Sequence, residues 1–172
     1  MNGKNWLITG GVIGLLAVVF GAFGAHGIEG VIPQWYGEDD LKKDDTVEES
    51  DAPPTWYRLD QLHQKKLKTW ITGVRYHFYH TLAIIAVGVL LLVSGQKNKW
   101  LDCAATCFVI GIAGFSGSIY VLVISKVGIL GMTAALGGVI LVLGWLFFVL
   151  GMLQFSARQP NVTLQSEASR EN

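Results

Sequence analysis

The sequence predicts an all-α integral membrane protein: a bundle of four transmembrane helices with an acidic loop and an amphipathic interfacial helix between the first two spans. Four stretches, 5–28, 76–96, 103–125 and 127–157, contain no Asp, Glu, Lys or Arg. Since about 20 helical residues cross the ~30 Å hydrocarbon core, each stretch is long enough to span a bilayer. The composition agrees, because 51% apolar residues and 21 glycines in 172 residues exceed what a soluble domain needs. We expect one membrane domain over 1–153 and a polar, disordered tail over 154–172.

The overall charge gives no indication of a charged partner. The 13 basic and 13 acidic residues cancel, which removes any whole-chain argument for nucleic acid or for an acidic substrate. The lipid bilayer is the one partner that the composition predicts directly. A homo-oligomer or another membrane protein is a further expectation that depends on function.

The first predicted span covers about 6–25 and has a seam of small residues. They recur every three or four positions, as Gly10, Gly14, Ala17, Gly21 and Ala25. Close backbone approach at such seams is a main source of packing energy in lipid, so the seam should face another helix. A cleaved signal peptide is the competing interpretation, because Lys4 precedes the apolar run and Ala22-Phe23-Gly24 resembles a cleavage site. The length of the run favours a retained span.

The connection at 29–75 divides by charge. Between Glu29 and Asp51 acidic residues far outnumber Lys42 and Lys43, and this part ends at Pro53-Pro54. Such a stretch buries too little apolar surface to fold alone and is predicted to be a mobile acidic loop. A cation-binding loop is an alternative, although the Asp-rich spacing of a calcium loop is absent.

The second part of the connection, 56–68, is basic and amphipathic. Its apolar residues continue at helical spacing into the second span, as Leu59, Leu62, Leu67, Trp70 and Ile71. We expect a helix lying in the headgroup region. Four aromatic residues are suitable interface anchors: Trp35, Tyr36, Trp56 and Tyr57.

The remaining spans are predicted at about 76–93, 101–124 and 129–153. The connections between them are short, which makes these three spans antiparallel neighbours. Gly114 with Ser118, and Ala134 with Gly138, have the small-xxx-small spacing of close helix contacts. Cys103 and Cys107 are four residues apart, which suits packing better than a disulfide. Four spans place both termini on one side, but basic residues flank both sides, so the orientation stays open.

Polar residues that are costly in lipid gather at one end of the predicted bundle. His26 ends the first span, Arg75, His77 and His80 begin the second, and Lys126 follows the third. The topology brings these toward the same membrane face. With their neighbours they form a candidate polar cluster or ligand-binding site: His26, Arg75, Tyr76, His77, His80, Ser116, Ser118 and Tyr120.

Three kinds of chemistry are conceivable for this cluster. His77 and His80, with His26 nearby, could hold a transition metal, but no carboxylate completes a ligand set, and an intramembrane His is more often structural, contributing about 1 kcal/mol. A proton relay would use the same groups, yet no span contains an Asp or Glu to couple a gradient. Phe115-Ser116-Gly117-Ser118 lacks the strand-turn-helix setting of a nucleophilic serine. We therefore assign no metal, cofactor or catalytic residue.

The chain resembles a known family, the small four-helix membrane proteins of the YgdD type, described as domain of unknown function 423. The matching pieces lie in all four spans: Gly21-Ala22-Phe23-Gly24-Ala25-His26, Thr72-Gly73-Val74-Arg75-Tyr76-His77-Phe78-Tyr79-His80, Phe115-Ser116-Gly117-Ser118-Ile119-Tyr120, and Gly137-Gly138 followed by Gly144-Trp145. Two features depart from the family pattern: an acidic insertion at about 30–55, and Ala134-Ala135 in place of Thr-Pro. The resemblance implies a bacterial multi-pass protein of the inner (plasma) membrane and implies no activity.

Together these observations predict a non-enzymatic structural or interaction protein of the membrane. The alternative is a small transporter or channel subunit, which would have to be a homo-oligomer because four helices rarely enclose a pore. An intramembrane enzyme comes third, since it needs a metal or an activated serine.

Overall fold

The computed structural model describes residues 2–44 and 53–155, which are almost entirely helical. The elements are α1 (Gly3–Phe23), the π-helix η1 (Gly24–Ile28), α2 (Glu29–Trp35), α3 (Glu38–Asp44), α4 (Thr55–Ser94), α5 (Lys99–Ile112), the π-helix η2 (Ala113–Gly117), α6 (Ser118–Ser125) and α7 (Leu130–Leu153). Four continuous helices are long and apolar enough to cross a membrane: Gly3–Trp35, Thr55–Ser94, Lys99–Ser125 and Leu130–Leu153. The predicted all-α membrane fold with four spans is confirmed.

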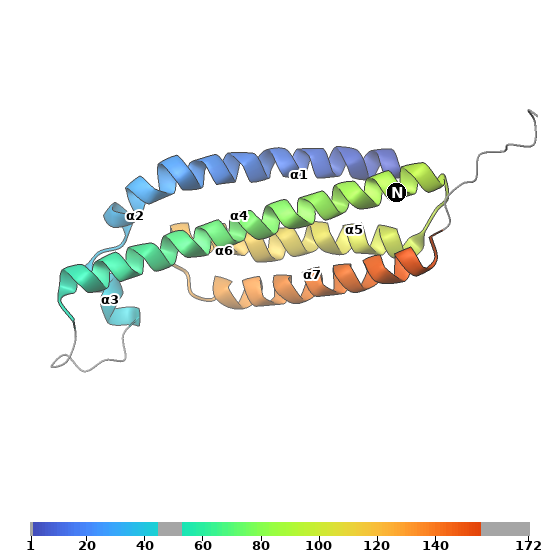
Figure 1. The fold of residues 1–172 in the computed structure, drawn as a ribbon. Coiled ribbons are helices and arrows are strands. Elements are labelled where there is room, and N and C mark those ends of the chain that lie inside the picture. Colours follow the sequence, from blue (N-terminus) through green and yellow to red (C-terminus); the bar gives the residue numbers. More distant parts are fainter. Residues whose placement is uncertain (1, 45–52, 156–172) are drawn as a thin grey trace, which may run out of the picture.

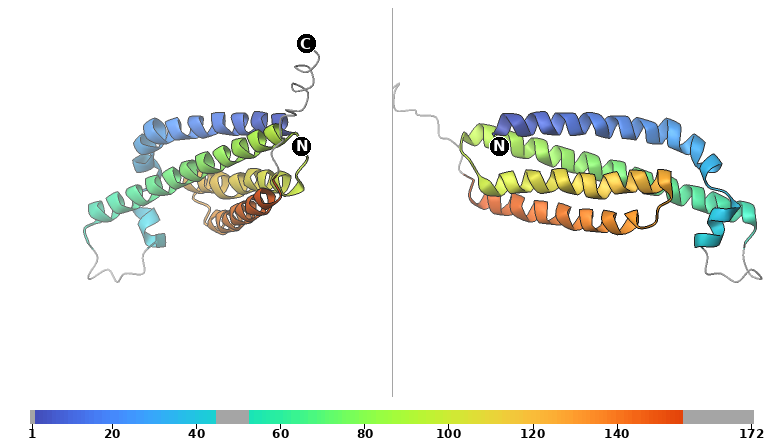
Figure 2. Two further views of the ribbon diagram at one scale, coloured as in Figure 1. Left: turned by 45° about the vertical axis from the view of Figure 1, so that its right-hand side comes forward. Right: turned by 180° about the vertical axis from the view of Figure 1, so that it is seen from behind.

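The four long helices form an elongated bundle (Figure 1). α1 packs on α4, α4 packs on α5, and α7 packs on α5, so that α1 and α7 lie on opposite sides of the central pair (Figures 1 and 2). The start of α1 and the end of α7 lie at the same end of the bundle, which we call the terminal end. The opposite end carries α2 and α3 and is called the loop end.

Short connections join the last three spans, as predicted. Gly95 (φ 62°) ends α4 in the left-handed conformation, and Lys126 (φ 60°) does the same after α6. Asn98 caps α5 by accepting hydrogen bonds from the Trp100 and Leu101 amides, and its own amide donates to the Gly151 carbonyl at 3.0 Å. The same side chain therefore ties the start of α5 to the end of α7.

The small-residue seam of α1 faces α4. A Cβ added at Gly10 would lie 2.6 Å from the Ile85 side chain, and one at Gly14 would lie 3.2 Å from the Thr81 side chain, so side chains of α4 pack directly against these two glycines. The prediction is wrong at its last position, because Ala25 is exposed and Gly24 is buried against Trp70 instead. The widened π-turn of η1 changes the helical register there.

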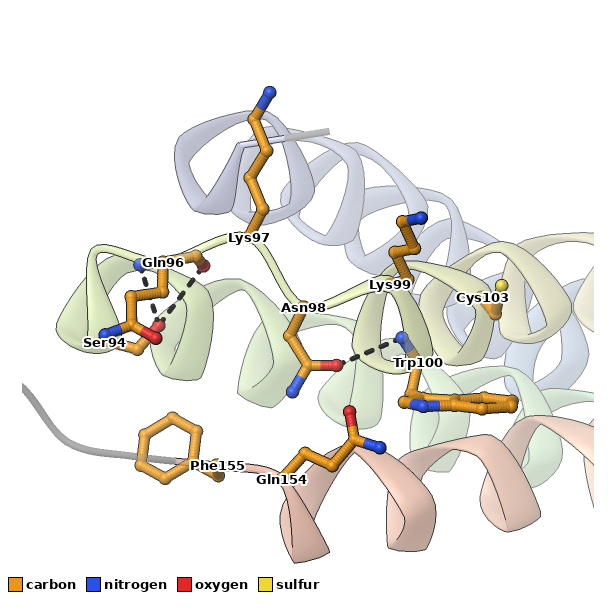
Figure 3. A pocket seen from close by; sticks show the side chains of 9 residues that line it. All are labelled: Ser94, Gln96, Lys97, Asn98, Lys99, Trp100, Cys103, Gln154 and Phe155. Carbon is orange, nitrogen blue, oxygen red and sulfur yellow. Dashed lines mark hydrogen bonds between the residues drawn. The ribbon is translucent and has the colours of Figure 1, made fainter.

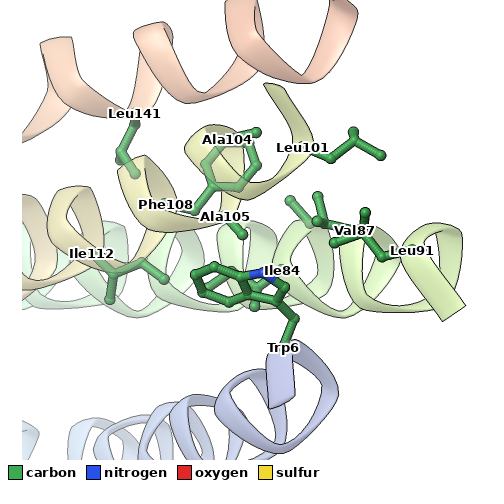
Figure 4. Packing of buried hydrophobic residues seen from close by; sticks show 11 residues of the cluster. Trp6, Ile84, Val87, Leu91, Leu101, Ala104, Ala105, Phe108, Ile112 and Leu141 are labelled. Carbon is green, nitrogen blue, oxygen red and sulfur yellow. The ribbon is translucent and has the colours of Figure 1, made fainter. Parts of the chain in front are cut away.

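At the terminal end, Trp6 of α1 inserts into a core made by α4, α5 and α7 (Figure 4). That core includes Ile84 and Val87 of α4 and Phe108 of α5, all fully buried. The indole Nε1 donates to Asp102 Oδ1 at 2.7 Å. This hydrogen bond gives a carboxylate at the start of the third span a polar partner on the first helix.

The connection between the first two spans is more ordered than predicted. The first helix continues to Trp35, and α3 follows at Glu38–Asp44. The helix expected at 56–68 is present, but it is the first part of the 40-residue α4, on one straight axis with the second span (Figure 1). The predicted mobility of the acidic loop at 45–52 and the predicted disorder of the tail at 156–172 lie outside the described residues.

The apolar face at the start of α4 is covered by protein. Leu62 and Trp70 are buried against four side chains from the end of the first helix and from α3: Ile28, Ile32, Tyr36 and Leu41. We refer to α2 and α3 as the α2–α3 cap. Because the cap supplies the apolar partner, the start of α4 projects from the bundle along the axis of the second span.

Candidate functional site

The depth of each polar residue follows from helix geometry. Lys97, Lys99 and Trp100 lie together at the terminal end, and such aromatic and basic residues are typical of the membrane–water boundary. The opposite membrane boundary lies about 20 helical residues from that end, near Arg75 in α4 and Tyr120 in α6. At 1.5 Å per residue, His77 and His80 lie about 3 and 8 Å deeper than Arg75.

His80 joins α4 to α7 through its Nε2 atom, and its Nδ1 atom bonds within α4. It is 5% exposed, its Nδ1 is 2.7 Å from the Tyr76 carbonyl oxygen, and its Nε2 is 3.2 Å from Trp145 Nε1. A carbonyl only accepts and an indole N–H only donates, so the imidazole is neutral with its proton on Nδ1. The rings of Phe108 and Trp145 lie 5.5 and 6.1 Å from the imidazole. Both hydrogen-bonding positions of His80 are therefore in use.

His77 joins α4 to α6. Its side chain is 4% exposed, and its Nδ1 lies 3.3 Å from the Tyr120 hydroxyl. The Tyr120 ring stacks on Phe20 of α1 at 4.4 Å and lies 4.7 Å from the Trp70 ring. Within the described part of the chain, His77 Nε2 makes no hydrogen bond. This group of rings holds α1, α4 and α6 together.

The two serines have different surroundings. Ser116, in the π-helix η2, is fully buried, and its hydroxyl has no hydrogen-bond partner among the described residues. Ser118 accepts a hydrogen bond of 2.9 Å from Thr133 and so joins α6 to α7. Phe115, beside Ser116, packs on the Tyr76 ring at 4.6 Å.

The structure does not bring all eight predicted residues into one pocket. His77 with Tyr120 forms one group, His80 with Tyr76 and Trp145 forms another, and Ser118 belongs to neither. His26 and Arg75 lie at the expected end of the bundle, but both side chains are exposed. Among the described residues, no three His, Cys, Asp or Glu side chains converge as metal ligands. Cys103 is exposed, Cys107 is half-buried, and both are free thiols.

Sequence reasoning missed a polar cluster at the loop end, centred on Tyr36. The Tyr36 hydroxyl donates to the Val123 carbonyl, and its own carbonyl lies 2.9 Å from His63 Nε2. Lys126 Nζ pairs with Asp40 at 2.8 Å, donates to the Trp35 carbonyl, and lies 4.7 Å above the Tyr36 ring. Burial, with a smaller effect from Asp40, raises the pKa of Tyr36 above its usual value, so its hydroxyl remains a donor at neutral pH. The signal available in the sequence was the aromatic pair at 35–36, interpreted as interface anchors.

Among the described residues, surface pockets lie outside the histidine groups. One of about 550 Å³ surrounds the connection between α4 and α5, where Figure 3 shows the Lys97 and Lys99 side chains pointing away from the Asn98 and Gln154 amides. A second, of about 330 Å³, lies beside the start of α1. The third, of about 240 Å³, is a groove between the first helix and α4 at the loop end, and both Glu29 and Arg75 line it.

These features define a class, the four-span α-helical membrane proteins whose spans are joined by hydrogen bonds between buried polar side chains. Residues 20–138 match the family described as "Protein of unknown function (DUF423)", and the chain belongs to that family, as the motifs predicted. It is 33% identical over 157 residues to the UPF0382 membrane protein YwdK of Bacillus subtilis, a match that covers 88% of this chain and 98% of the relative. It is 31% identical over 153 residues to a UPF0382 membrane protein of Staphylococcus epidermidis, with coverages of 89% and 98%.

No solved structure matches the fold. The relatives are bacterial proteins named as membrane proteins, and the chain has four candidate spans. It is therefore a multi-pass protein of the cell inner (plasma) membrane, as predicted.

Proposed function

We propose that the protein is a non-enzymatic structural or interaction protein of the membrane, in which the His/Tyr/Ser side chains stabilise the bundle. The observation that carries this proposal is the state of His80. Its Nδ1 donates to the Tyr76 carbonyl within α4 and its Nε2 accepts from Trp145 of α7, so neither nitrogen is available to a metal or to a substrate without breaking one of these hydrogen bonds.

The outer surfaces of the bundle support an interaction role. In the most apolar part of α4, half of the residues are buried inside the protein. In the most apolar parts of the first helix and of α7, only 17% and 22% of the residues are buried. Large apolar side chains such as Leu15, Leu136 and Val142 are exposed there. These faces contact lipid and are also available to a second copy or to another membrane protein, because helix association in lipid depends on packing and not on the exclusion of water.

The test is a double-mutant cycle on His80 and Trp145 in lipid nanodiscs. Trp145→Phe keeps an aromatic ring but removes the Nε1 donor, and His80→Ala removes the acceptor. Each single variant should lose about 1 kcal/mol of stability, since interhelical hydrogen bonds in membranes average ~0.6 and reach ~1.7 kcal/mol. The double variant should lose less than the sum of the two.

Trp100→Phe is the matched control. Trp100 packs on Phe147, and the described residues provide no partner for its indole N–H. The melting temperature should therefore change less in the Trp100→Phe variant than in the Trp145→Phe variant. Unchanged or raised stability in both His80→Ala and Trp145→Phe would contradict the structural role and would favour retention of these groups for a ligand or an ion.

We further propose that the partner of the outer faces is a second copy or another membrane protein. Native mass spectrometry of the protein released directly from membranes measures this. A species of monomer mass alone, with no associated protein, would contradict the interaction role and also the transporter or channel alternative, which needs an oligomer.

A further inference from the structure

We propose that the groove between the first helix and α4, lined by Glu29 and Arg75, binds the headgroup of an ethanolamine phospholipid. The phosphate would lie against Arg75 and the primary ammonium against Glu29, with the acyl chains continuing along the apolar surface of the bundle. This inference goes beyond the structural role proposed above and does not depend on it.

The floor of the groove is apolar. Gly21 and Gly24 contribute no side chains, and Trp70 and Val74 of α4 form the opposite wall. A Cβ at Gly24 would lie 2.6 Å from Trp70 Nε1, so the helices are already in contact beneath the groove. Its volume of about 240 Å³ therefore lies above that contact, on the outer surface of the helix pair.

Two opposite charges line this groove without neutralising each other. Among the described residues, neither Glu29 nor Arg75 has an ion-pair partner, although both line the same cavity. Arg75 is also the only charged residue between Lys68 and Lys97. An arginine at the edge of the hydrocarbon core is costly unless it reaches water or an anion, and its planar guanidinium binds phosphate through paired hydrogen bonds.

The vertical order of the two charges matches one headgroup. Gly24 packs on Trp70, and the two helices are antiparallel, so Glu29 lies five residues outward of that level and Arg75 five residues inward, about 15 Å apart along the axis. Helical side chains lean toward the N-terminus of their helix. Arg75 therefore leans outward and Glu29 leans inward, toward each other. In a phospholipid the phosphate is the deeper group and the amine the outer one, which is the same order.

The chemistry of the carboxylate selects among headgroups. An ethanolamine ammonium carries three N–H donors for Glu29, whereas a choline ammonium carries none. A glycerol headgroup offers hydroxyl donors but no positive charge, so it satisfies Arg75 and leaves the Glu29 carboxylate without a counter-ion. Charge-assisted hydrogen bonds are the stronger kind, so the expected order of affinity is ethanolamine, then glycerol, then choline.

The test uses the full-length protein, delipidated in detergent, with dioleoyl phosphatidylethanolamine, phosphatidylglycerol or phosphatidylcholine added at equal mole fractions. Native mass spectrometry counts the bound lipids, and the shift in melting temperature measures their effect. The native chain should bind the ethanolamine lipid most tightly. Arg75→Gln should weaken binding of the ethanolamine and glycerol lipids about tenfold, since a hydrogen bond to a charged group contributes ~1.5–3 kcal/mol.

Glu29→Gln separates this proposal from simple phosphate binding. It should keep the binding of phosphatidylglycerol and lose the preference for phosphatidylethanolamine over it, so that the ratio of the two affinities falls to about one. Lys97→Gln, at the terminal end, is the control and should change neither affinity. Because Glu29 and Arg75 are exposed, both variants should fold, and their melting temperatures without added lipid verify this.

Equal binding of ethanolamine and choline lipids by the native chain would overturn the proposal, as would undiminished binding by Arg75→Gln. Loss of a dimer, instead of loss of lipid, in the Arg75 and Glu29 variants would show that the groove is a protein contact. That result would contradict the lipid site and leave the proposed interaction role intact.

Discussion

Individual polar residues inside the spans differ in how fully their hydrogen-bonding groups are used. His80 uses both ring nitrogens, and Thr81 donates to the His77 carbonyl at 2.7 Å. Ser116 is also fully buried, but its hydroxyl has no hydrogen-bond partner among the described residues. A buried polar group without a partner lowers stability by about 1–3 kcal/mol. The serine is thus a destabilising residue at this position.

Ser116→Ala should therefore raise stability. The change removes the hydroxyl and leaves the packing volume almost unchanged, so we expect an increase of about 1 kcal/mol in the free energy of unfolding, measured in nanodiscs or mixed micelles. Thr81→Val is the control, because it removes a hydroxyl that has an acceptor, and should not stabilise. A clear loss of stability in Ser116→Ala would show that the hydroxyl makes an interaction that the helix packing alone does not reveal.

At the scale of elements, pairs of helices approach through particular glycines. The contact of α7 with η2 depends on Gly137, where a Cβ would overlap the backbone of Gly114 and Phe115. At the next residue, Gly138, an added Cβ would lie 3.6 Å from its nearest neighbour, a carbon of the Phe115 ring. The close contact therefore requires glycine at 137 but leaves room for a larger residue at 138.

Gly137→Ala should destabilise the bundle severely and Gly138→Ala should not. Because the overlapping atoms belong to backbone, α7 would have to move away from η2, and a loss of more than about 2 kcal/mol is expected. Gly138→Ala should be neutral or slightly stabilising, since alanine favours helix over glycine by about 1 kcal/mol. The melting temperatures of the two variants provide the comparison, and equal effects would show that the α7 contact is looser than this geometry.

The elements that the sequence predicted well are those whose ends are marked by charge or by turn residues. The spans predicted at 101–124 and 129–153 correspond to helices at Lys99–Ser125 and Leu130–Leu153, because Asn98 and Lys126 interrupt the apolar pattern. The acidic connection was predicted less well, since its composition was considered in isolation. The apolar residues Ile32 and Leu41 are too few to fold alone, but they become buried once α4 presents Leu62 and Trp70.

The sequence predicted the position of the candidate site residues along the helices, but not the helix face on which each side chain lies. Counting residues along the spans placed His26 and Arg75 at the same end as Tyr120, which is where they lie. Each helical residue also turns by about 100°, and only residues on the face toward a neighbour can join a cluster. The π-turns η1 and η2 change that rotation, and nothing in a single sequence marks where an extra residue enters a turn.

At the scale of the whole molecule, the α2–α3 cap closes the loop end of the bundle. It connects the first helix, the start of α4 and the end of α6 through Tyr36, His63 and Lys126. Lys126 combines three contacts: the ion pair with Asp40, the bond to the Trp35 carbonyl, and the position above the Tyr36 ring. Lys126 also ends α6 in a left-handed backbone conformation, and these three contacts place its side chain against the cap.

Lys126→Met should release the cap and leave the spans folded. An exposed ion pair contributes about 0.2–1 kcal/mol and a cation–π contact ~0.5–1 kcal/mol, so with the bond to Trp35 the total is about 2 kcal/mol, or a ~30-fold larger open population. Hydrogen–deuterium exchange should rise by that factor at 36–44 and in the first turns of α4, with unchanged exchange at 80–94. Lys68→Met removes an exposed lysine from α4 and should change neither region. Unchanged exchange in Lys126→Met would mean that the buried residues Ile32, Tyr36 and Leu41 hold the cap without help from the charges.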